Sequence, residues 1–311
     1  MIRLRTGFSP GAKRLRAMSL ALVLSGSVAL MPANGAAAEH LSSDEPEAWA
    51  MFYFTSVTLF SGLGTPRQRE PGSVEMALEL GNIPHLSTEQ RTVGFGGTKV
   101  EDLNNSPLLA RPILTVGLPW SLALSLSYVP PVKVFGVRPN LLAMALERPL
   151  LIRGPWTAGA RLHGQVGYTK GSFTCPSGVA GFPPGSDGNP YGCEATSNDK
   201  AIQNYVGLEL SGSYRIDALG GLAPYLAVGA NYLDTAFQVH AQTFGAPDRT
   251  KLSADTWTFS LGAGFAYPFG DNASVSLGVF YTPLWVTRPP ETSQEPDSLI
   301  NARTQFTYRI H

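Results

Sequence analysis

Charged and polar side chains recur at alternate positions within runs that are otherwise apolar. Glu209, for example, stands between Leu208 and Leu210. A strand turns successive side chains to opposite faces, so these polar residues share one face of their strands. Charges enclosed on such a face must be paired or reach water. They could therefore line a path for a polar solute, or form ion pairs that close a narrow space. The candidates are Glu75, Glu79, Glu147, Arg161, His163, Gln165, Glu209, Arg303 and Arg309.

No motif for catalysis or metal binding accompanies these residues. The five histidines show neither an HxxxH spacing nor a cluster with cysteine, which argues against a zinc site. His163 shares its face with Arg161 and Gln165, but with no serine that could act beside it in lipid hydrolysis. The loop from Ser186 to Asp199 is rich in oxygen ligands but lacks the EF-hand spacing. We therefore expect no enzyme, no resident metal and no cofactor.

The elements that position these residues are strands with two different faces. In the run from Trp257 to Tyr267, large apolar residues alternate with Thr, Ser and Gly. Only 15% of all residues are charged, and aromatic residues gather near the ends of such runs. A lipid-facing apolar band with aromatic girdles and a polar lumen explains this pattern better than a soluble sheet does. The sequence predicts an all-β, transmembrane, antiparallel up-and-down β-barrel.

The N-terminal residues have the order of a secretory signal peptide. Five basic residues precede an apolar stretch, Met18 to Met31, and small residues follow up to Ala38. We expect cleavage after Ala38, which leaves 18 basic against 23 acidic residues and a net charge of −5. A mildly acidic protein has no electrostatic reason to bind nucleic acid. Export and the barrel pattern together predict the outer membrane of a Gram-negative bacterium.

Cys175 and Cys193 are the only cysteines, and they lie in a stretch rich in Gly, Pro, Ser and Asp. An exported protein meets an oxidising compartment, so we expect a disulfide between them. Such a bond would stiffen an exposed loop.

The number of strands depends on the N-terminal part. We expect residues 39–50 to be a periplasmic segment with a possible short helix, capped by Ser43 or Asp44, and residues 51–311 to be the barrel. If residues 51–60 and 89–97 both form strands, the barrel has about 12 strands. In the alternative, residues 51–60 are a helix or plug segment and the barrel has 10. Short connections should face the periplasm and long ones the exterior.

The last strand, residues 301–311, resembles the C-terminal assembly signal of bacterial outer-membrane proteins. Phe306, Tyr308 and Ile310 supply its alternating aromatic and apolar positions, although His311 adds one residue beyond the usual end. The resemblance is to Gram-negative outer-membrane β-barrels in general, including porin-like and small-molecule-uptake barrels. It implies that the barrel-assembly machinery recognises this strand, and that outer-membrane lipid and lipopolysaccharide surround the barrel.

Three functions are compatible with this sequence. We expect a narrow channel or transporter for small solutes, with an unknown solute. The alternatives are a structural or surface-interaction barrel with a sealed lumen, and an outer-membrane lipid-modifying enzyme.

Overall fold

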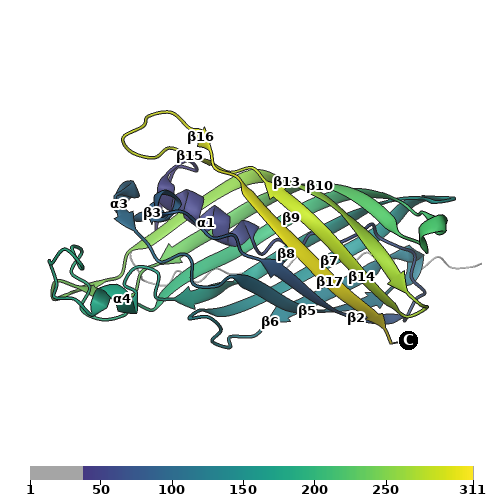
Figure 1. The fold of residues 1–311 in the computed structure, drawn as a ribbon, viewed down its shortest axis with the longest axis horizontal. Coiled ribbons are helices and arrows are strands. Elements are labelled where there is room, and N and C mark those ends of the chain that lie inside the picture. The colour runs from purple at the N-terminus through teal and green to yellow at the C-terminus, as the bar shows by residue number, and fades with distance from the viewer. Residues whose placement is uncertain (1–37, 311) are drawn as a thin grey trace, which may run out of the picture. The chain divides into compact units, whose positions relative to one another are not determined.

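The protein is a closed antiparallel β-barrel (Figure 1). The computed structural model describes residues 38–310, and ten of its strands pair edge to edge around a complete ring. Each strand pairs with its neighbours in the sequence, except that β2 and β17 join the two ends of the series. The ring strands are β2 (Val74–Asn82), β5 (Leu108–Gly117), β6 (Ala123–Val129), β7 (Arg138–Arg153), β8 (Trp156–Gly171), β9 (Asp199–Tyr214), β10 (Ala223–Gln238), β13 (Lys251–Phe269), β14 (Ala273–Thr282) and β17 (Leu299–Arg309).

The two ends of the barrel differ in their connections. One end, the short-turn end, carries tight connections such as residues 270–272 and also the end of β17. The other end, the long-loop end, carries five longer connections with small elements of their own (Figure 1). These elements are α2 (Thr88–Arg91), β3 (Thr92–Val93), α3 (Gly94–Gly97), β4 (Lys99–Val100), α4 (Ser177–Ala180), β11 (Ala241–Thr243), β12 (Ala246–Asp248), β15 (Trp285–Val286) and β16 (Glu295–Pro296). Two further short elements at the short-turn end are 3-10 turns, η1 (Pro119–Ser121) and η2 (Asp217–Leu219).

The outer surface of the ring is apolar and the inner face is polar. Leu208 and Leu210 are 53% and 51% exposed, whereas Glu209 between them is only 2% exposed. The same contrast repeats around the ring at Met76, Leu78, Leu114, Leu126, Leu142, Met144, Leu162, Val206, Leu226, Val228, Leu261 and Val279, which are all exposed. An apolar outer band on a fully paired ring is how proteins cross an outer membrane with strands. The predicted all-β antiparallel barrel and its outer-membrane location are confirmed.

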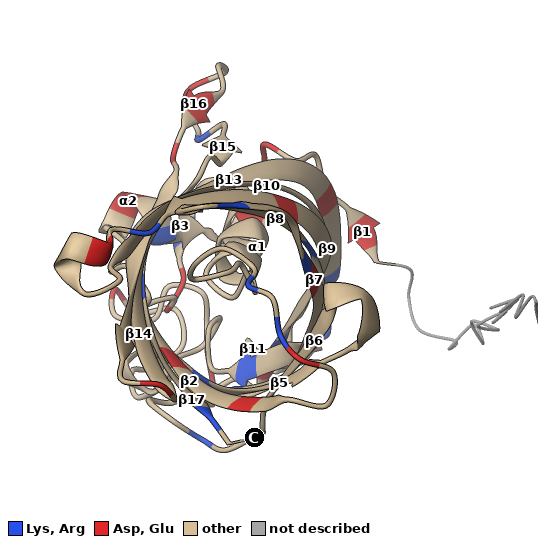
Figure 2. Cartoon of the chain, turned by 90° about the vertical axis from the view of Figure 1, so that its right-hand side faces the viewer, with Lys and Arg blue, Asp and Glu red and all other residues tan. Residues whose placement is uncertain are grey.

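A segment that precedes the first ring strand fills the lumen. β1 (Glu39–His40) pairs in parallel with Leu252 and Ser253 of β13 at the long-loop end. Helix α1 (Pro46–Ser56) then lies inside the ring (Figure 2), and the chain continues to the short-turn end, where Gly72 N donates to Gly117 O at 2.8 Å. We call residues 41–73 the N-terminal plug.

Helix α1 suits an enclosed position because it is apolar on nearly every side. Trp49, Met51, Phe52 and Tyr53 are all at most 4% exposed. A helix that is hydrophobic all round is stable only when it is buried. Pro46 occupies the first helical turn, where its missing N–H leaves no hydrogen bond unmade. None of the helices in residues 38–310 has the length and hydropathy needed to span a bilayer.

The structure corrects the prediction for the N-terminal part. Residues 51–60, predicted as the first strand, belong to α1 and the chain after it, and residues 89–97 form short helices with only β3 between them. The barrel therefore has the ten strands of the alternative, and the prediction of 12 is not confirmed. The helix begins at Pro46, after Glu45, without a side-chain cap from Ser43 or Asp44.

The segment 39–50 also lies elsewhere than predicted. It sits at the long-loop end, opposite the short-turn end that was expected to face the periplasm. The predicted signal peptide, residues 1–38, falls outside the described residues except for Ala38.

The predicted disulfide between Cys175 and Cys193 is present, with 5.7 Å between the two Cα atoms. Both cysteines are fully buried and belong to the long loop between β8 and β9. This loop packs on the connection between β2 and β5, because the Phe95 and Tyr191 rings stack with centroids 5.3 Å apart. The crosslink therefore stabilises the loop layer over the long-loop end.

Candidate functional site

The middle of the lumen is a seat for the residues that follow helix α1. Arg111 of β5 is 2% exposed and donates to Thr58 O at 3.0 Å and to Leu59 O at 2.9 Å. Its guanidinium also pairs with Glu79 of β2 at 2.8 Å. Arg303 of β17 donates to the same Leu59 carbonyl and lies 3.6 Å from Glu79. The barrel wall thus satisfies backbone carbonyls of the irregular segment that follows α1.

Other wall residues complete this seat. Gln203 Nε2 donates to Phe54 O at 2.7 Å, and Gln165 Nε2 donates to Thr58 Oγ1 at 2.9 Å. On the same strand as Gln203, the hydroxyl of Tyr205 accepts a hydrogen bond from Phe60 N at 2.5 Å. Side chains of the wall therefore fix the plug at its backbone as well as at its side chains.

Phe60 and Gly62 make close contacts with charged side chains of the wall. The ring of Phe60, which is 1% exposed, lies between the guanidinium carbons of Arg111 and Arg161, at 5.0 and 4.8 Å from its centroid. Gly62 N donates to both carboxylate oxygens of Glu209, at 3.1 and 3.2 Å. A Cβ at position 62 would lie 3.0 Å from Glu209 Oε1, so glycine lets the backbone approach this carboxylate.

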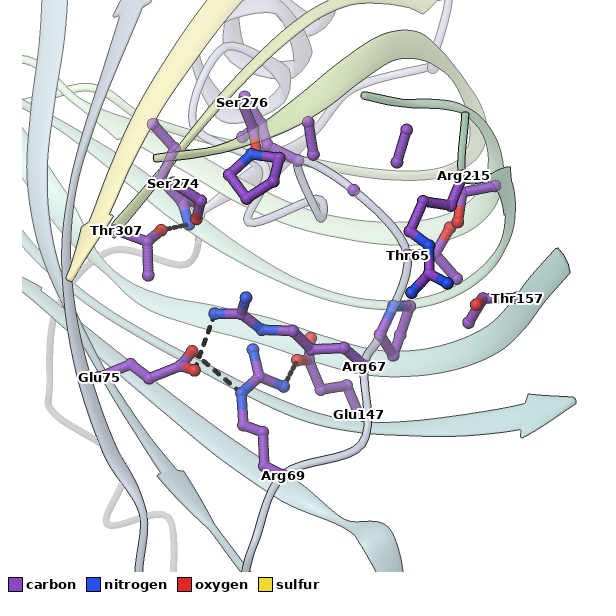
Figure 3. Close-up of a pocket in the computed structure, with 18 of the residues that line it drawn as sticks. Thr65, Arg67, Arg69, Glu75, Glu147, Thr157, Arg215, Ser274, Ser276 and Thr307 are labelled. Carbon is purple, nitrogen blue, oxygen red and sulfur yellow. Dashed lines mark hydrogen bonds and ion pairs between the residues drawn. The ribbon is translucent and has the colours of Figure 1, made fainter. Parts of the chain in front are cut away.

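Below this level, a charged network ties the plug to the wall near the short-turn end (Figure 3). Arg67 and Arg69 of the plug reach Glu75 of β2 at 2.7 and 3.0 Å. Arg69 also reaches Glu147 of β7 at 2.5 Å, and Arg161 of β8 reaches the other oxygen of Glu147 at 2.7 Å. These residues border a cavity of about 460 Å³, whose charged lining is four arginines and two glutamates. This cavity is therefore basic.

A second cavity, of about 420 Å³, lies at the long-loop end between α1 and the loops above it. Its walls are mostly apolar, and its ionisable lining consists of five carboxylates: Glu39, Glu45, Glu47, Glu101 and Asp248. Burial raises the pKa of Glu101 to about 7, although the neighbouring Lys99 opposes this shift. The plug therefore separates an acidic cavity at one end from a basic cavity at the other.

The structure brings most of the predicted site residues together in the lumen. Glu75, Glu79, Glu147, Arg161, Glu209 and Arg303 all contact the plug or one another there. Gln165 is part of the plug seat, as described above. Arg309 is different, because it lies at the margin with its side chain 42% exposed, 3.6 Å from Glu75.

His163 is enclosed but makes no polar contact. It is 2% exposed, and neither of its ring nitrogens has a hydrogen-bond partner. Its ring packs edge-on against Tyr205, with centroids 5.8 Å apart. This environment supplies no hydroxyl nucleophile and no orienting acid, which are the groups that a hydrolytic histidine needs. In the described part of the chain, no group of three or more potential ligands is arranged to hold a metal ion.

Sequence reasoning found Arg161 and Arg303 but missed three other arginines that hold the plug, Arg67, Arg69 and Arg111. Arg111 shares its strand face with Leu109 and Ile113, which concealed an inward charge among apolar residues. Arg67 and Arg69 lie in a stretch without any strand period. The sequence offered one signal of an inward arginine: Arg111 alternates along its strand with Ala110 and Pro112, which places its side chain on the opposite face from theirs.

Comparisons with known proteins find the same kind of architecture. No protein-family model and no curated protein sequence matches the chain. Among solved structures, Ail, the attachment invasion locus protein of Yersinia pestis, matches 78% of this chain and 100% of its own, with 11% identity and a TM-score of 0.30. The outer-membrane protease OmpT of Escherichia coli matches 77% and 94%, with 9% identity and a TM-score of 0.37. The toluene transporter TodX of Pseudomonas putida matches 87% and 99%, with 12% identity and a TM-score of 0.33. At these identities the likeness concerns the barrel fold alone.

Proposed function

We propose that the protein is a gated passage for small solutes, which its own N-terminal plug closes at rest. The observation that supports this proposal is the pair of cavities, one at each end of the lumen, with the seated plug between them. With the end of β17 in the periplasm, the acidic cavity faces the exterior and the basic cavity faces the periplasm. No catalytic step is part of the proposal.

The dimensions support passage when the plug moves. An α-helix with its side chains is about 10–12 Å across. A lumen that accommodates α1 therefore has room for a small solute at the same level. The plug is held by hydrogen bonds and ion pairs to the wall rather than by a covalent bond, so its release is a reversible equilibrium.

Conductance and solute flux test this proposal directly. Purified protein would be reconstituted into planar bilayers and liposomes, as wild type and as a deletion of residues 41–72. We expect rare openings from the wild type, and continuous conductance with rapid flux from the deletion. Arg69→Met, which releases two ion pairs of the plug, should raise the frequency of opening while the wall remains complete.

Two controls make the result decisive. Arg138→Met removes an exposed arginine at the start of β7 that lines neither cavity, and it should leave conductance unchanged. Heat-dependent gel mobility shows that each barrel is folded. If folded Arg69→Met and the folded deletion both conduct no more than the wild type, gated passage is excluded and the sealed-lumen function takes its place.

That alternative has an observation in its favour. Leu59 and Phe60 are each only 1% exposed in the plug seat, and the crosslinked loops extend beyond the ring at the long-loop end (Figure 1). A barrel whose role is surface interaction would use those loops and need no opening. Recognition of β17 by the barrel-assembly machinery stays a prediction in either case.

A further inference from the structure

We propose that the cavity at the long-loop end binds a small organic cation that carries an aromatic or other apolar group, such as an aryl-alkyl amine. This inference deepens the proposed function, since it names the class of solute that the exterior cavity would take. It depends on the composition of the cavity wall, on its charge and on where that charge lies.

The walls offer an apolar compartment with aromatic faces. Phe54 of α1, Phe173 and Phe237 form a continuous row, with successive ring centroids 5.3 and 6.1 Å apart. Aliphatic side chains complete the lining at Leu41, Met51, Val93, Leu103, Val239 and Leu252. An apolar cavity with a few polar groups is the usual form of a small-molecule site. Aromatic faces also attract cations through the negative charge above their rings.

The charge on the lining has one sign. Five carboxylates line the cavity, and no lysine, arginine or histidine among the described residues does so. Lys99 lies behind the wall, where its ammonium contacts Glu101 at 3.1 Å and Thr174 O at 2.6 Å. Glu101 is therefore partly neutralised by this lysine. The remaining carboxylates leave the cavity with a negative potential that favours a cation.

Glu47 is the carboxylate in this lining that a bound cation would stabilise in its charged form. One of its carboxylate oxygens accepts a hydrogen bond from Gly96 N at 2.5 Å, and the other has no hydrogen-bond partner. Burial raises the pKa of Glu47, and the like charges of Glu45 and Glu39 raise it further. A carboxylate with this environment is costly to ionise alone. A cation in the adjacent cavity would offset that cost through charge attraction in a partly water-excluded space.

The other end of the lumen would not hold the same ligand. The basic cavity carries four arginines against two glutamates, so it repels a cation that the acidic cavity attracts. Binding should therefore occur at one end only, the end that the loops surround.

Three matched probes test the inference: 2-naphthylmethylamine, 2-naphthylmethanol and 2-naphthoate. They share an aromatic body and differ in charge, so their binding isolates the electrostatic contribution. Calorimetric titrations would use the full mature chain in phosphatidylcholine nanodiscs, with empty nanodiscs as the reference for partition into lipid. We expect the amine to bind at least tenfold more tightly than the alcohol, and the naphthoate to show no binding.

Variants assign the binding to this cavity. Glu47→Gln should weaken the amine about tenfold and leave the alcohol unchanged. Phe237→Ala should weaken both by a similar factor, because it removes apolar contact without changing charge. Glu291→Gln, on an exposed loop outside the cavity, should change neither.

The possible failures are distinguishable. Equal affinity for amine and alcohol, or an unchanged amine affinity in Glu47→Gln, would overturn the assignment to cations. Absence of binding by all three probes to a folded barrel would overturn the site itself. The wild type could bind the amine specifically while neither the wild type nor the deletion of residues 41–72 passes solute. That result would leave this inference standing and remove the proposed passage.

Discussion

Replacing Arg111 by methionine should loosen the plug while the barrel stays folded. The substitution keeps an unbranched apolar stem and removes three donated hydrogen bonds, to Thr58 O, Leu59 O and Glu79. Hydrogen bonds to a charged group contribute about 1.5–3 kcal/mol each. Leu59 O keeps Arg303 as a donor, so the loss is complete only at Thr58 O. Glu79 keeps Arg303 at 3.6 Å, so the larger cost of an unpaired buried charge does not arise.

The expected cost to plug seating is therefore about 2–3 kcal/mol, because one charged hydrogen bond is lost and another is weakened. At about 1.4 kcal/mol for each factor of ten, the unseated population rises about 30- to 150-fold. Hydrogen exchange with mass spectrometry measures this directly, as loss of protection in residues 57–62. Protection in β8 and β9 should persist, and Arg215→Met serves as the control on an exposed ion pair. A fall of less than about fivefold in residues 57–62, or an equal fall throughout the barrel, would refute the reasoning.

Three further predictions concern the lipid face, the crosslink and a buried acid. Leu210→Arg should lower the free energy of unfolding by about 2–4 kcal/mol in urea titrations in vesicles, because an outward leucine meets hydrocarbon; an unchanged midpoint would contradict that orientation. Serine at both Cys175 and Cys193 should destabilise the loop between them by about 3 kcal/mol and speed its proteolysis. The heat-dependent gel mobility should stay as in the wild type, and its loss would show that the barrel depends on the crosslink. Burial raises the pKa of Glu101 to about 7 from an ordinary 4.5, so the neutral acid is favoured in the fold and its stabilising effect is lost as the pH rises through 7. The midpoint temperature of thermal unfolding should therefore fall between pH 5 and pH 8 more steeply in the wild type than in Glu101→Gln. Parallel curves for the two proteins would argue against a raised pKa for Glu101.

The orientation of strand residues was predictable from sequence because a strand has a strict period of two. Glu209 is buried while Leu208 and Leu210 are exposed, and the inward positions of Glu79 and Glu147 follow in the same way. Period two also revealed the ten ring strands. It did not reveal what the inward charges contact, since their partners on the plug lie in a segment without regular spacing.

The N-terminal segment was harder because its composition suits two structures. Residues 51–60 are rich in aromatic and β-branched side chains and carry no charge, which fits a buried strand as well as a buried helix. The structure resolves this ambiguity through tertiary contacts: the lumen wall binds Phe54 O in the last turn of α1, and Thr58 O and Leu59 O just beyond the helix. The acidic cavity was equally hidden, because its lining comes from five separate stretches of the chain.

The two hydrogen bonds to the Leu59 carbonyl depend on closure of the ring during assembly. Its two guanidinium donors, from Arg111 and Arg303, belong to β5 and β17, the strands on either side of β2. The contact between β2 and β17 joins the first and last ring strands, so it forms only when the whole chain has been incorporated. Before closure, an open sheet presents only one of the two arginines to the Leu59 carbonyl. Seating of the N-terminal segment therefore depends on complete assembly, since the segment gains its full set of hydrogen bonds only in a barrel that has closed.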